Sequence, residues 1–331
     1  MTSNRSEKST TVRSTLWALR RAAIRTLHQL APARAADVAA RWFVTPSRPA
    51  TARAGAEVAR REAAHAGDAA GRAIDPGTPL VLTDGRLRLA ARSWGTGATA
   101  LLVHGWNGRG AQLAPIARAL AARGYRAVAF DHPAHGDSRG RTVTIPEMAD
   151  AIQMVSEQLG GVQALVAHSL GAVAATLALS RGGLRPERAA FLAPPLDPEE
   201  WVTRFGRALG LPASADGDLI AAIEARAGMS VSALRPLALA PALSTELLIV
   251  HDRGDREVPL ENGEALAQAW PGAHLVTTDG LGHRRLLASP GVVELVAEFI
   301  GDPPADRFAA RVPGAPRDRH FAAIVDQILA S

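Results

Sequence analysis

The sequence predicts an α/β fold, with a mainly parallel, doubly wound sheet that carries helices on both faces. First, short continuous apolar runs, typical of buried parallel strands, alternate with helical segments between residues 98 and 300. Second, "PLVLTDGRLRLAARSW" contains two alternating runs on either side of Asp84-Gly85, a strong hairpin signal that opens the sheet. Third, polar residues cluster directly after the apolar runs, where such sheets bind their ligands.

The individual elements follow in chain order. After the hairpin we expect strands at "ATALLVHG", "YRAVAFDHP", "QALVAHS", "RAAFLAP", "ELLIVHD" and "AHLVTTD". Helices are expected at 111–124, 145–159, 170–180, 261–270 and 292–300. The alternation stops at residues 197–244, where apolar residues lie between Gly and Pro breaks. This insertion is expected to form two or three short helices.

Composition and charge exclude several classes of protein. The chain has 331 residues, 47% hydrophobic and 21% charged, which is typical of a globular protein with a substantial core. The absence of cysteine excludes disulfides, thiolate metal sites and a cysteine nucleophile. Residues 1–61 carry twelve Arg or Lys and three acidic residues, a net charge of +9, which leaves −4 for the rest of a chain of net charge +5. Because the main body is acidic, we expect no nucleic-acid partner.

The basic N-terminal segment has the periodicity of an amphipathic helix. Its apolar residues recur at three- and four-residue steps, at Leu16, Leu19, Ala23, Ile24, Leu27 and Leu30. Such a helix either docks on the body or on a second copy, or lies on an anionic membrane surface. Arg20, Arg21 and Arg25 interrupt any apolar run, which argues against a secretory signal. We therefore expect a cytoplasmic protein, with peripheral membrane contact or self-association through this helix as open alternatives.

A strand-to-helix turn at "AHSLG", residues 167–171, offers a nucleophile. Small flanking residues let strand and helix approach each other, and the Ser169 hydroxyl projects over the sheet beside the N–H groups of the next helix. A serine hydroxyl needs a base, and the base needs an orienting acid. Asp255 follows the strand "ELLIVHD" and His283 follows "AHLVTTD". The order Ser, Asp, His is the one expected of this architecture.

Four segments together resemble the α/β-hydrolase superfamily of serine hydrolases. They are "HGW", "DHPAHGDS", "AHSLG" and the pair "HDRGDREVP" and "GLGH", in this order across roughly residues 78 to 300. The resemblance implies an α/β-hydrolase fold, with Ser169 as nucleophile, His283 as general base and Asp255 as the acid. It also implies an oxyanion hole made by the backbone N–H groups of Trp106 and Leu170, and a helical lid formed by the insertion.

The chain departs from the family pattern at two positions. Ala167 stands where the family usually has Gly, and it is small enough for the turn. Asp252 stands where a Gly is usual, so a second carboxylate lies three residues before Asp255. The spacing to Val258-Pro259 favours Asp255 as the acid, with Asp252 as the alternative.

The remaining polar motifs are interpreted as scaffold. In "DHPAHGDS" the spacing of His132, His135 and Asp137 fits no recognised zinc pattern, so we expect these side chains to hold this loop and the neighbouring oxyanion loop. His104, His168 and His251 each lie near a strand end and are expected to be hydrogen-bonded structural histidines. "HGWNGRG" lacks the Lys of a phosphate loop. No metal and no organic cofactor is expected.

The resemblance implies a serine-dependent hydrolase of a small-molecule carboxylic ester with an apolar acyl part. The alternatives are an acyltransferase or a carbon-carbon bond hydrolase with the same triad, and a non-catalytic scaffold of this fold. The expected organisation is a basic helical extension at 1–77, a core at 78–301 with the lid at about 197–244, and an addition at 302–331. That addition combines a proline-rich connector with an amphipathic helix at 318–330.

Overall fold

The computed structural model describes residues 3–47 and 75–301, and the side chains from residue 17 onward. The chain divides into two compact units, one made of residues 1–45 and 197–234 and the other of residues 46–196 and 235–331. The predicted connector and C-terminal helix, 302–331, lie outside the described residues, as does most of the segment between 48 and 77.

The second unit contains an eight-stranded sheet with the order β1-β2-β4-β3-β5-β6-β7-β8. β1 pairs antiparallel with β2 and β2 antiparallel with β4, and every other pair is parallel. The strands are β1 (Thr78–Thr83), β2 (Arg88–Trp94), β3 (Ala98–Val103), β4 (Tyr125–Phe130), β5 (Ala164–His168), β6 (Arg188–Leu192), β7 (Glu246–Asp252) and β8 (Ala273–Thr278). This arrangement confirms the predicted fold class and the predicted opening hairpin.

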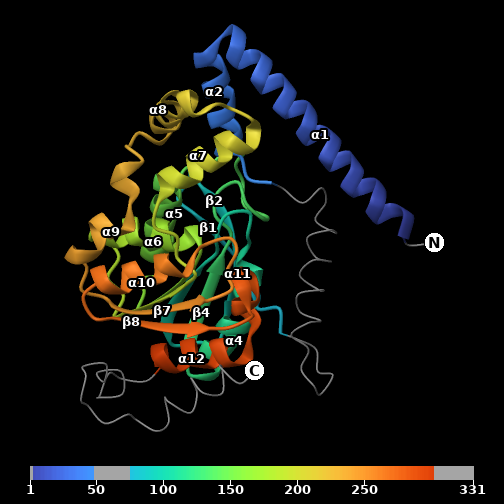
Figure 1. The fold of residues 1–331 in the computed structure, drawn as a ribbon. Helices are drawn as coiled ribbons and strands as arrows, with labels where there is room; N and C mark the ends of the chain where they lie inside the picture. Colours follow the sequence, from blue (N-terminus) through green and yellow to red (C-terminus); the bar gives the residue numbers. More distant parts are fainter. Residues whose placement is uncertain (1–2, 48–74, 302–331) are drawn as a thin grey trace. The chain divides into compact units, whose positions relative to one another are not determined.

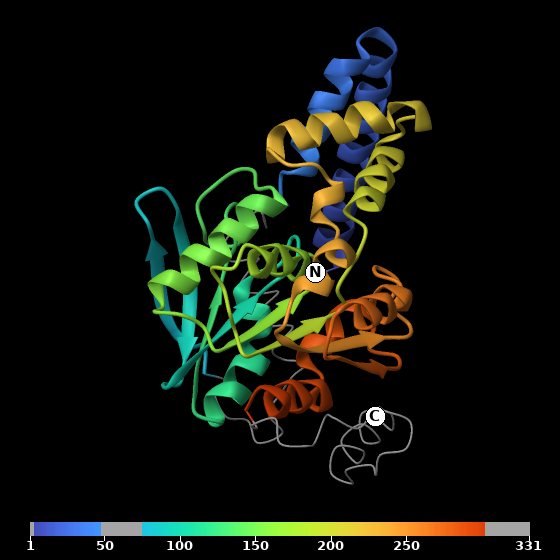
Figure 2. The ribbon, with the colours of Figure 1, turned by 90° about the vertical axis from the view of Figure 1, so that its left-hand side faces the viewer.

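Helices cover both faces of this sheet (Figure 2). α4 (Ala114–Ala122) and α12 (Pro290–Gly301) pack on one face, in a core that includes Leu102, Ile116 and Phe299. The other face carries α5 (Ile145–Gln158), α6 (Leu170–Ser180) and α10 (Leu260–Ala269). Because both faces are covered, the central strands β5 and β6 are buried along their whole length, which explains their continuous apolar sequence.

Local sequence signals set the ends of these helices. Thr144 and Glu147 form a capping box at the start of α5, in which each side chain accepts a hydrogen bond from the other residue's backbone N–H. α6 begins directly after Ser169 and is buried from Gly171 to Leu179. Short elements complete the unit: η1 (Gly110–Leu113), α9 (Pro236–Leu239), η4 (Ala240–Ala242), α11 (Gly282–Arg285) and η5 (Leu286–Ala288).

The first unit is helical and combines two segments that lie far apart in the sequence, residues 1–45 and 197–234. It consists of α1 (Ser3–Leu30), α2 (Pro32–Phe43), α7 (Pro198–Leu209), η2 (Ala213–Ala215), α8 (Asp216–Ala227) and η3 (Ser232–Leu234). One core holds Ile24 and Ala39 from the N-terminal helices together with Val202, Leu209 and Leu219 from the insertion. The N-terminal segment and most of the insertion therefore fold together, while residues 235–244 belong with the sheet unit.

Candidate active site

Ser169 lies on the sharp turn between β5 and α6. Its backbone has φ 52° and ψ −129°, a left-handed conformation that strains a residue with a side chain by roughly 1–3 kcal/mol. The Ser169 N–H donates to the Leu192 carbonyl at 2.9 Å, which ties the turn to the neighbouring strand β6. This conformation lifts the hydroxyl above the carboxyl edge of the sheet.

Two glycines allow the close approach that this turn requires. A Cβ added to Gly105 would lie 2.8 Å from the Cβ of Ser169, and one added to Gly171 would lie 2.5 Å from the carbonyl oxygen of His104. The loop after β3 therefore packs directly against the serine and the start of α6. Ala167 is fully buried in β5, so the position where the family usually has Gly accommodates a methyl group.

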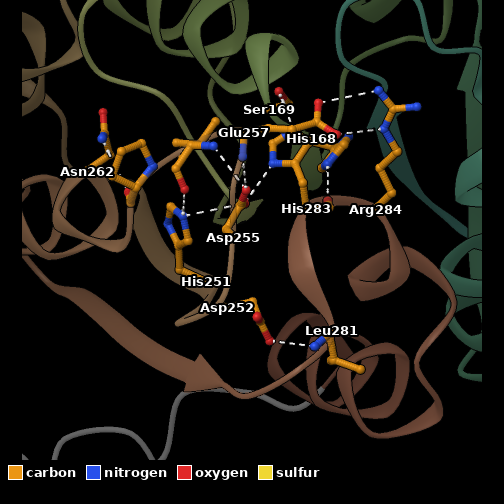
Figure 3. Close-up of polar contacts among 12 residues, drawn as sticks. His168, Ser169, His251, Asp252, Asp255, Glu257, Asn262, Leu281, His283 and Arg284 are labelled. Atoms are coloured by element: carbon orange, nitrogen blue, oxygen red, sulfur yellow. Dashed lines mark hydrogen bonds and ion pairs between the residues drawn. The ribbon is translucent and has the colours of Figure 1, made fainter.

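The structure brings Ser169, His283 and Asp255 into one hydrogen-bonded chain (Figure 3). His283 lies on α11, after β8, and its Nε2 is 2.9 Å from the Ser169 Oγ. Its Nδ1 is 2.7 Å from Oδ2 of Asp255. When Asp255 is ionised and the ring is neutral, Nδ1 carries the proton and Nε2 accepts from the serine hydroxyl.

Asp255 is held by the loop that follows β7. Its Oδ1 accepts hydrogen bonds from the backbone N–H groups of Glu257, at 2.8 Å, and Val258, at 3.0 Å, while Oδ2 faces His283. The side chain is fully buried. Burial raises the pKa of Asp255, but the hydrogen bonds from His283 and from the two N–H groups outweigh it, so the pKa is lowered. The carboxyl group is therefore an anion at neutral pH.

Asp252, the alternative acid, has a different set of partners. Its Oδ1 accepts from the Gly254 N–H at 2.9 Å, and its Oδ2 accepts from the Thr278 hydroxyl at 2.8 Å and the Leu281 N–H at 2.9 Å. These bonds join the end of β7 to the end of β8 and to the loop before His283. Burial raises the pKa of Asp252, and hydrogen bonds from Thr278 and from backbone N–H groups outweigh it, so this pKa is lowered too. The structure thus places Asp255 against His283, and Asp252 in the scaffold that carries both.

Two histidines expected to be structural also border this chain of three residues. The His168 Nε2 is 3.0 Å from the carbonyl oxygen of His283, and the two rings lie 4.8 Å apart between centroids. His251 Nε2 is 3.0 Å from the carbonyl of Val258 and 3.7 Å from Oδ2 of Asp255. Burial, with the nearby His283, lowers the pKa of His168 to about 3, and burial lowers that of His251. Both rings are therefore neutral and hold the backbone on either side of the site.

The loop after β4, residues 131–138, supports the loop after β3. Asp131 Oδ1 accepts from the Gly110 N–H at 2.7 Å, and His135 Nε2 accepts from the Asn107 N–H at 3.2 Å. His104 Nε2 accepts from the His132 N–H at 3.0 Å. Burial lowers the pKa of His104 to about 4, so it stays neutral and able to accept. Asp131 and His135 thus hold the neighbouring loop, and the Ser138 hydroxyl donates to the Asp131 carbonyl at 2.6 Å within its own loop. The prediction is confirmed for His135 but not for His132, whose two ring nitrogens have no hydrogen-bond partner among the described residues.

The backbone at Trp106 and Leu170 lies next to the serine. Leu170 is the first residue of α6, where a helix leaves its N–H groups without intrahelical acceptors. Trp106 follows Gly105, the residue that packs against the Ser169 Cβ. Both positions are therefore neighbours in sequence of residues at the serine turn, Leu170 of Ser169 itself and Trp106 of Gly105.

Sequence reasoning did not identify two contacts that join the loops of the site. Thr278 binds Asp252 as described above, and Arg284 forms an exposed ion pair with Glu257, Nε to Oε1 at 3.1 Å. Neither contact could have been predicted from the sequence, because a Thr at a strand end and an Arg beside a histidine are both common. Only the pairing of β7 with β8 brings these residues together.

The comparisons with known proteins agree with this architecture. A family model described as "Alpha/beta hydrolase family" matches residues 100–295. The sequence has no significant match among curated proteins. Solved structures that resemble it include a thermophilic esterase from Thermogutta terrifontis, with 21% identity and a TM-score of 0.53 over 68% of this chain and 98% of that one.

Two further structures show how far the likeness extends. An esterase from Exiguobacterium antarcticum has 19% identity and a TM-score of 0.53, covering 68% of this chain and all of that one. A bromoperoxidase from Bacillus anthracis has 18% identity and the same TM-score of 0.53, with 68% of this chain and 100% of that one covered. At such low identity the likeness shows the fold, and the chemistry has to be argued from the site.

Proposed function

Because the chain belongs to the alpha/beta hydrolase family, we propose that it is a serine-dependent hydrolase of carboxylic esters. The observation that carries the proposal is the hydrogen-bonded chain from Ser169 through His283 to Asp255, with 2.9 Å and 2.7 Å separations. A serine needs a base within this distance to become a nucleophile, and the base needs an anion on its far nitrogen. All three side chains are buried or nearly so, which strengthens their electrostatic coupling.

In the first half-reaction, His283 Nε2 takes the proton of Ser169 as Oγ attacks the ester carbonyl. The backbone N–H groups of Trp106 and Leu170 stabilise the negative charge on the carbonyl oxygen. His283 then gives its proton to the leaving alkoxide oxygen, which departs as an alcohol and leaves an acyl group on Ser169. Asp255 holds the ring in the required tautomer and stabilises its positive charge.

In the second half-reaction, His283 removes a proton from a water molecule. The resulting hydroxide attacks the acyl-serine, and the same two N–H groups stabilise the new negative charge. Collapse of this intermediate returns the proton from His283 to the Ser169 oxygen and releases the carboxylic acid. The steps need no group beyond these residues and water.

The choice of an apolar acyl part is supported by the insertion. Residues 197–234 are rich in apolar side chains, yet several of them, including Val202, Leu209 and Leu219, are buried in the core that they share with α1 and α2. Others remain accessible at least in part, such as Trp201 and Met229. We propose that the insertion is the lid of the hydrolase.

Labelling with a fluorophosphonate tests the serine mechanism. We expect the wild-type protein to be labelled, Ser169→Ala to be unlabelled, and Ser180→Ala, an exposed serine at the end of α6, to be labelled like the wild type. Equal labelling of Ser169→Ala, or no labelling of the wild type, would contradict the proposal and favour a non-catalytic scaffold.

Turnover of p-nitrophenyl esters tests the substrate class. We expect kcat/KM to rise with acyl length from acetate to octanoate, because each methylene buried contributes about 0.8 kcal/mol, close to a fourfold effect. A labelled protein that hydrolyses no ester of the series would instead support the acyltransferase or carbon-carbon hydrolase alternatives.

A further inference from the structure

Helix α1 buries one side and exposes another that is also apolar. Ile24, 1% exposed, packs into the helical core with α2, α7 and α8, and Leu27 packs against the same core. Farther around the helix from Ile24, Leu19 is 62% exposed and Leu30 is 80% exposed. Ala22, Ala23 and Thr26 fall between these leucines at three- and four-residue steps, so they share one continuous face. We define this exposed face of α1 by Leu19, Ala22, Ala23, Thr26 and Leu30.

Three arginines lie beside this face. Residues 17–30 contain Arg20, Arg21 and Arg25 and no acidic residue. All three are exposed, and within the described part of the chain none of them forms an ion pair, although the guanidinium of Arg20 lies over the ring of Trp42, 5.5 Å from its centroid. At about 100° per residue, Arg20 and Arg25 flank the exposed face on its two sides. An apolar stripe bordered by exposed cations is the pattern of a helix that lies in the plane of an anionic lipid surface.

Other occupants fit this face less well. A second copy docking through the same face would bring the arginines of both copies together, because a twofold interface pairs identical surfaces. Residues 302–331 of this chain carry four Arg and four Asp, so their net charge supplies no attraction. A nucleic acid would bind the arginines but would leave the two exposed leucines without a partner. An anionic bilayer interface accepts both the leucines and the cations.

We propose that the exposed face of α1 docks this protein on an anionic membrane surface. The helix lies parallel to the bilayer, with Leu19 and Leu30 inserted at the level of the acyl boundary and the arginines among the headgroup phosphates. Because α1 shares a core with α7 and α8, the insertion is carried to the membrane with it. Within residues 3–47 and 75–301 no helix is long and apolar enough to span a bilayer. The inference is independent of the chemistry at Ser169.

Vesicle co-sedimentation of the full chain tests the proposal. We expect the wild-type protein to bind vesicles of phosphatidylcholine with about one third phosphatidylglycerol, and to bind pure phosphatidylcholine at least tenfold more weakly. Raising NaCl from about 0.1 to about 0.5 M weakens binding, because the Debye length shortens. Arg21→Gln/Arg25→Gln lowers the partition coefficient by roughly fivefold per arginine, so about 25-fold for the pair.

The leucine pair separates membrane insertion from simple charge attraction. Leu19→Gln/Leu30→Gln places neutral polar groups on exposed positions and leaves the net charge unchanged, so the protein stays folded while the partition coefficient falls at least tenfold. Val81→Gln, at a strand residue that is 50% exposed, and Arg86→Gln/Arg141→Gln, at exposed positions of the sheet unit, are the matched controls and bind like the wild type. Ser169→Ala also binds like the wild type, whether or not the protein proves to be an esterase.

Several results would overturn the inference. One is the absence of wild-type binding to anionic vesicles, and another is unchanged binding by the leucine variant. A wild-type dimer that Leu19→Gln/Leu30→Gln converts to a monomer, without vesicle binding, would assign the face to a second copy. Binding to duplex DNA without binding to vesicles would assign the arginines to nucleic acid.

Discussion

Two loops at the carboxyl edge of the sheet, residues 131–138 and 251–259, have similar compositions and different roles. Each contains at least one histidine and two aspartates. In the first loop, Asp131 binds the backbone N–H groups of Gly110 and Asp137. In the second, Asp252 also binds backbone, but Asp255 turns one oxygen to His283. The role of each carboxylate therefore depends on the group that faces it. For Asp255 that group is His283, on the helix that follows the neighbouring strand β8.

The largest expected effect concerns Asp255. Asp255→Asn keeps the shape of the side chain but removes the anion that orients His283, so we expect kcat to fall about 10⁴-fold. Ester turnover under saturating substrate measures this loss, and circular dichroism checks that the fold is retained. A loss of less than tenfold would mean that the contact between Asp255 and His283 does not serve catalysis, and the contrast between the two loops would disappear.

The second prediction concerns Gly105, in the loop that residues 131–138 support. In Gly105→Ala the new Cβ would lie 2.8 Å from the Ser169 Cβ, so the serine or the loop has to move. A displacement of about 1 Å at the reacting groups lowers kcat/KM roughly 100-fold. Gly217→Ala, in α8, is the matched control, because an added Cβ meets no atom within 4 Å there. Equal activity of the two variants would contradict the proposed role of this loop.

The third prediction compares the two scaffold carboxylates. In Asp131→Asn and in Asp252→Asn, a carboxylate that accepts hydrogen bonds from backbone N–H groups is replaced by an amide. The NH2 group of this amide cannot accept those hydrogen bonds. We expect each change to lower the free energy of unfolding by about 2 kcal/mol, measured by urea titration. Because neither side chain touches His283, kcat/KM stays within about tenfold of the wild type, in contrast to Asp255→Asn. A larger activity loss for Asp252→Asn would make it a second acid.

The smallest effect is a pH dependence of stability. The lowered pKa values of His104, about 4, and His168, about 3, keep these rings neutral in the folded protein, whereas an unfolded histidine titrates near its ordinary pKa of about 6.5. The unfolded chain therefore binds more protons than the folded protein between about pH 6.5 and about pH 4. The free energy of unfolding consequently decreases as the pH is lowered through this window. Each such histidine contributes a slope of about 1.4 kcal/mol per pH unit.

His168→Gln tests this dependence. Glutamine can still donate to the His283 carbonyl, so we expect the variant to fold. The change of its unfolding free energy per pH unit should be smaller than that of the wild type by the contribution of one histidine. Urea titrations at pH 5 and pH 7 of both proteins measure the difference. An unchanged slope would show that His168 does not take up a proton on unfolding.

The sequence predicted the regular elements well, because each depends on local patterns. The bounds expected for α6 and β7 match the structure, those of α5 differ by one residue at one end, and those of α10 differ by one residue at each end. The predicted strand-to-helix turn at "AHSLG" is present, and the structure adds that Ser169 has a positive φ there. The separate helix α2, in contrast, was not distinguished within the N-terminal extension, although Pro32 at its first turn is a helix-start signal.

The packing partners of the insertion could not be predicted from the sequence. Its apolar residues predicted short helices with apolar faces, and α7 and α8 agree with that prediction. The sequence alone did not indicate what those faces cover. The structure places Leu209 and Leu219 in a core with Ile24 and Ala39, from the other end of the chain. Such long-range pairing leaves no local signal.

The strand and helix order, the serine turn between strand and helix, and the order of Ser169, Asp255 and His283 could all be predicted from the sequence, since they follow from periodicity, small residues and spacing. The folded structure was needed to show which of two nearby carboxylates meets His283, which backbone groups the loop at 131–138 supports, and which face of α1 is left exposed. These outcomes depend on which strands and helices become neighbours. That choice is made by packing across the whole chain, where residues far apart in sequence compete for the same partner.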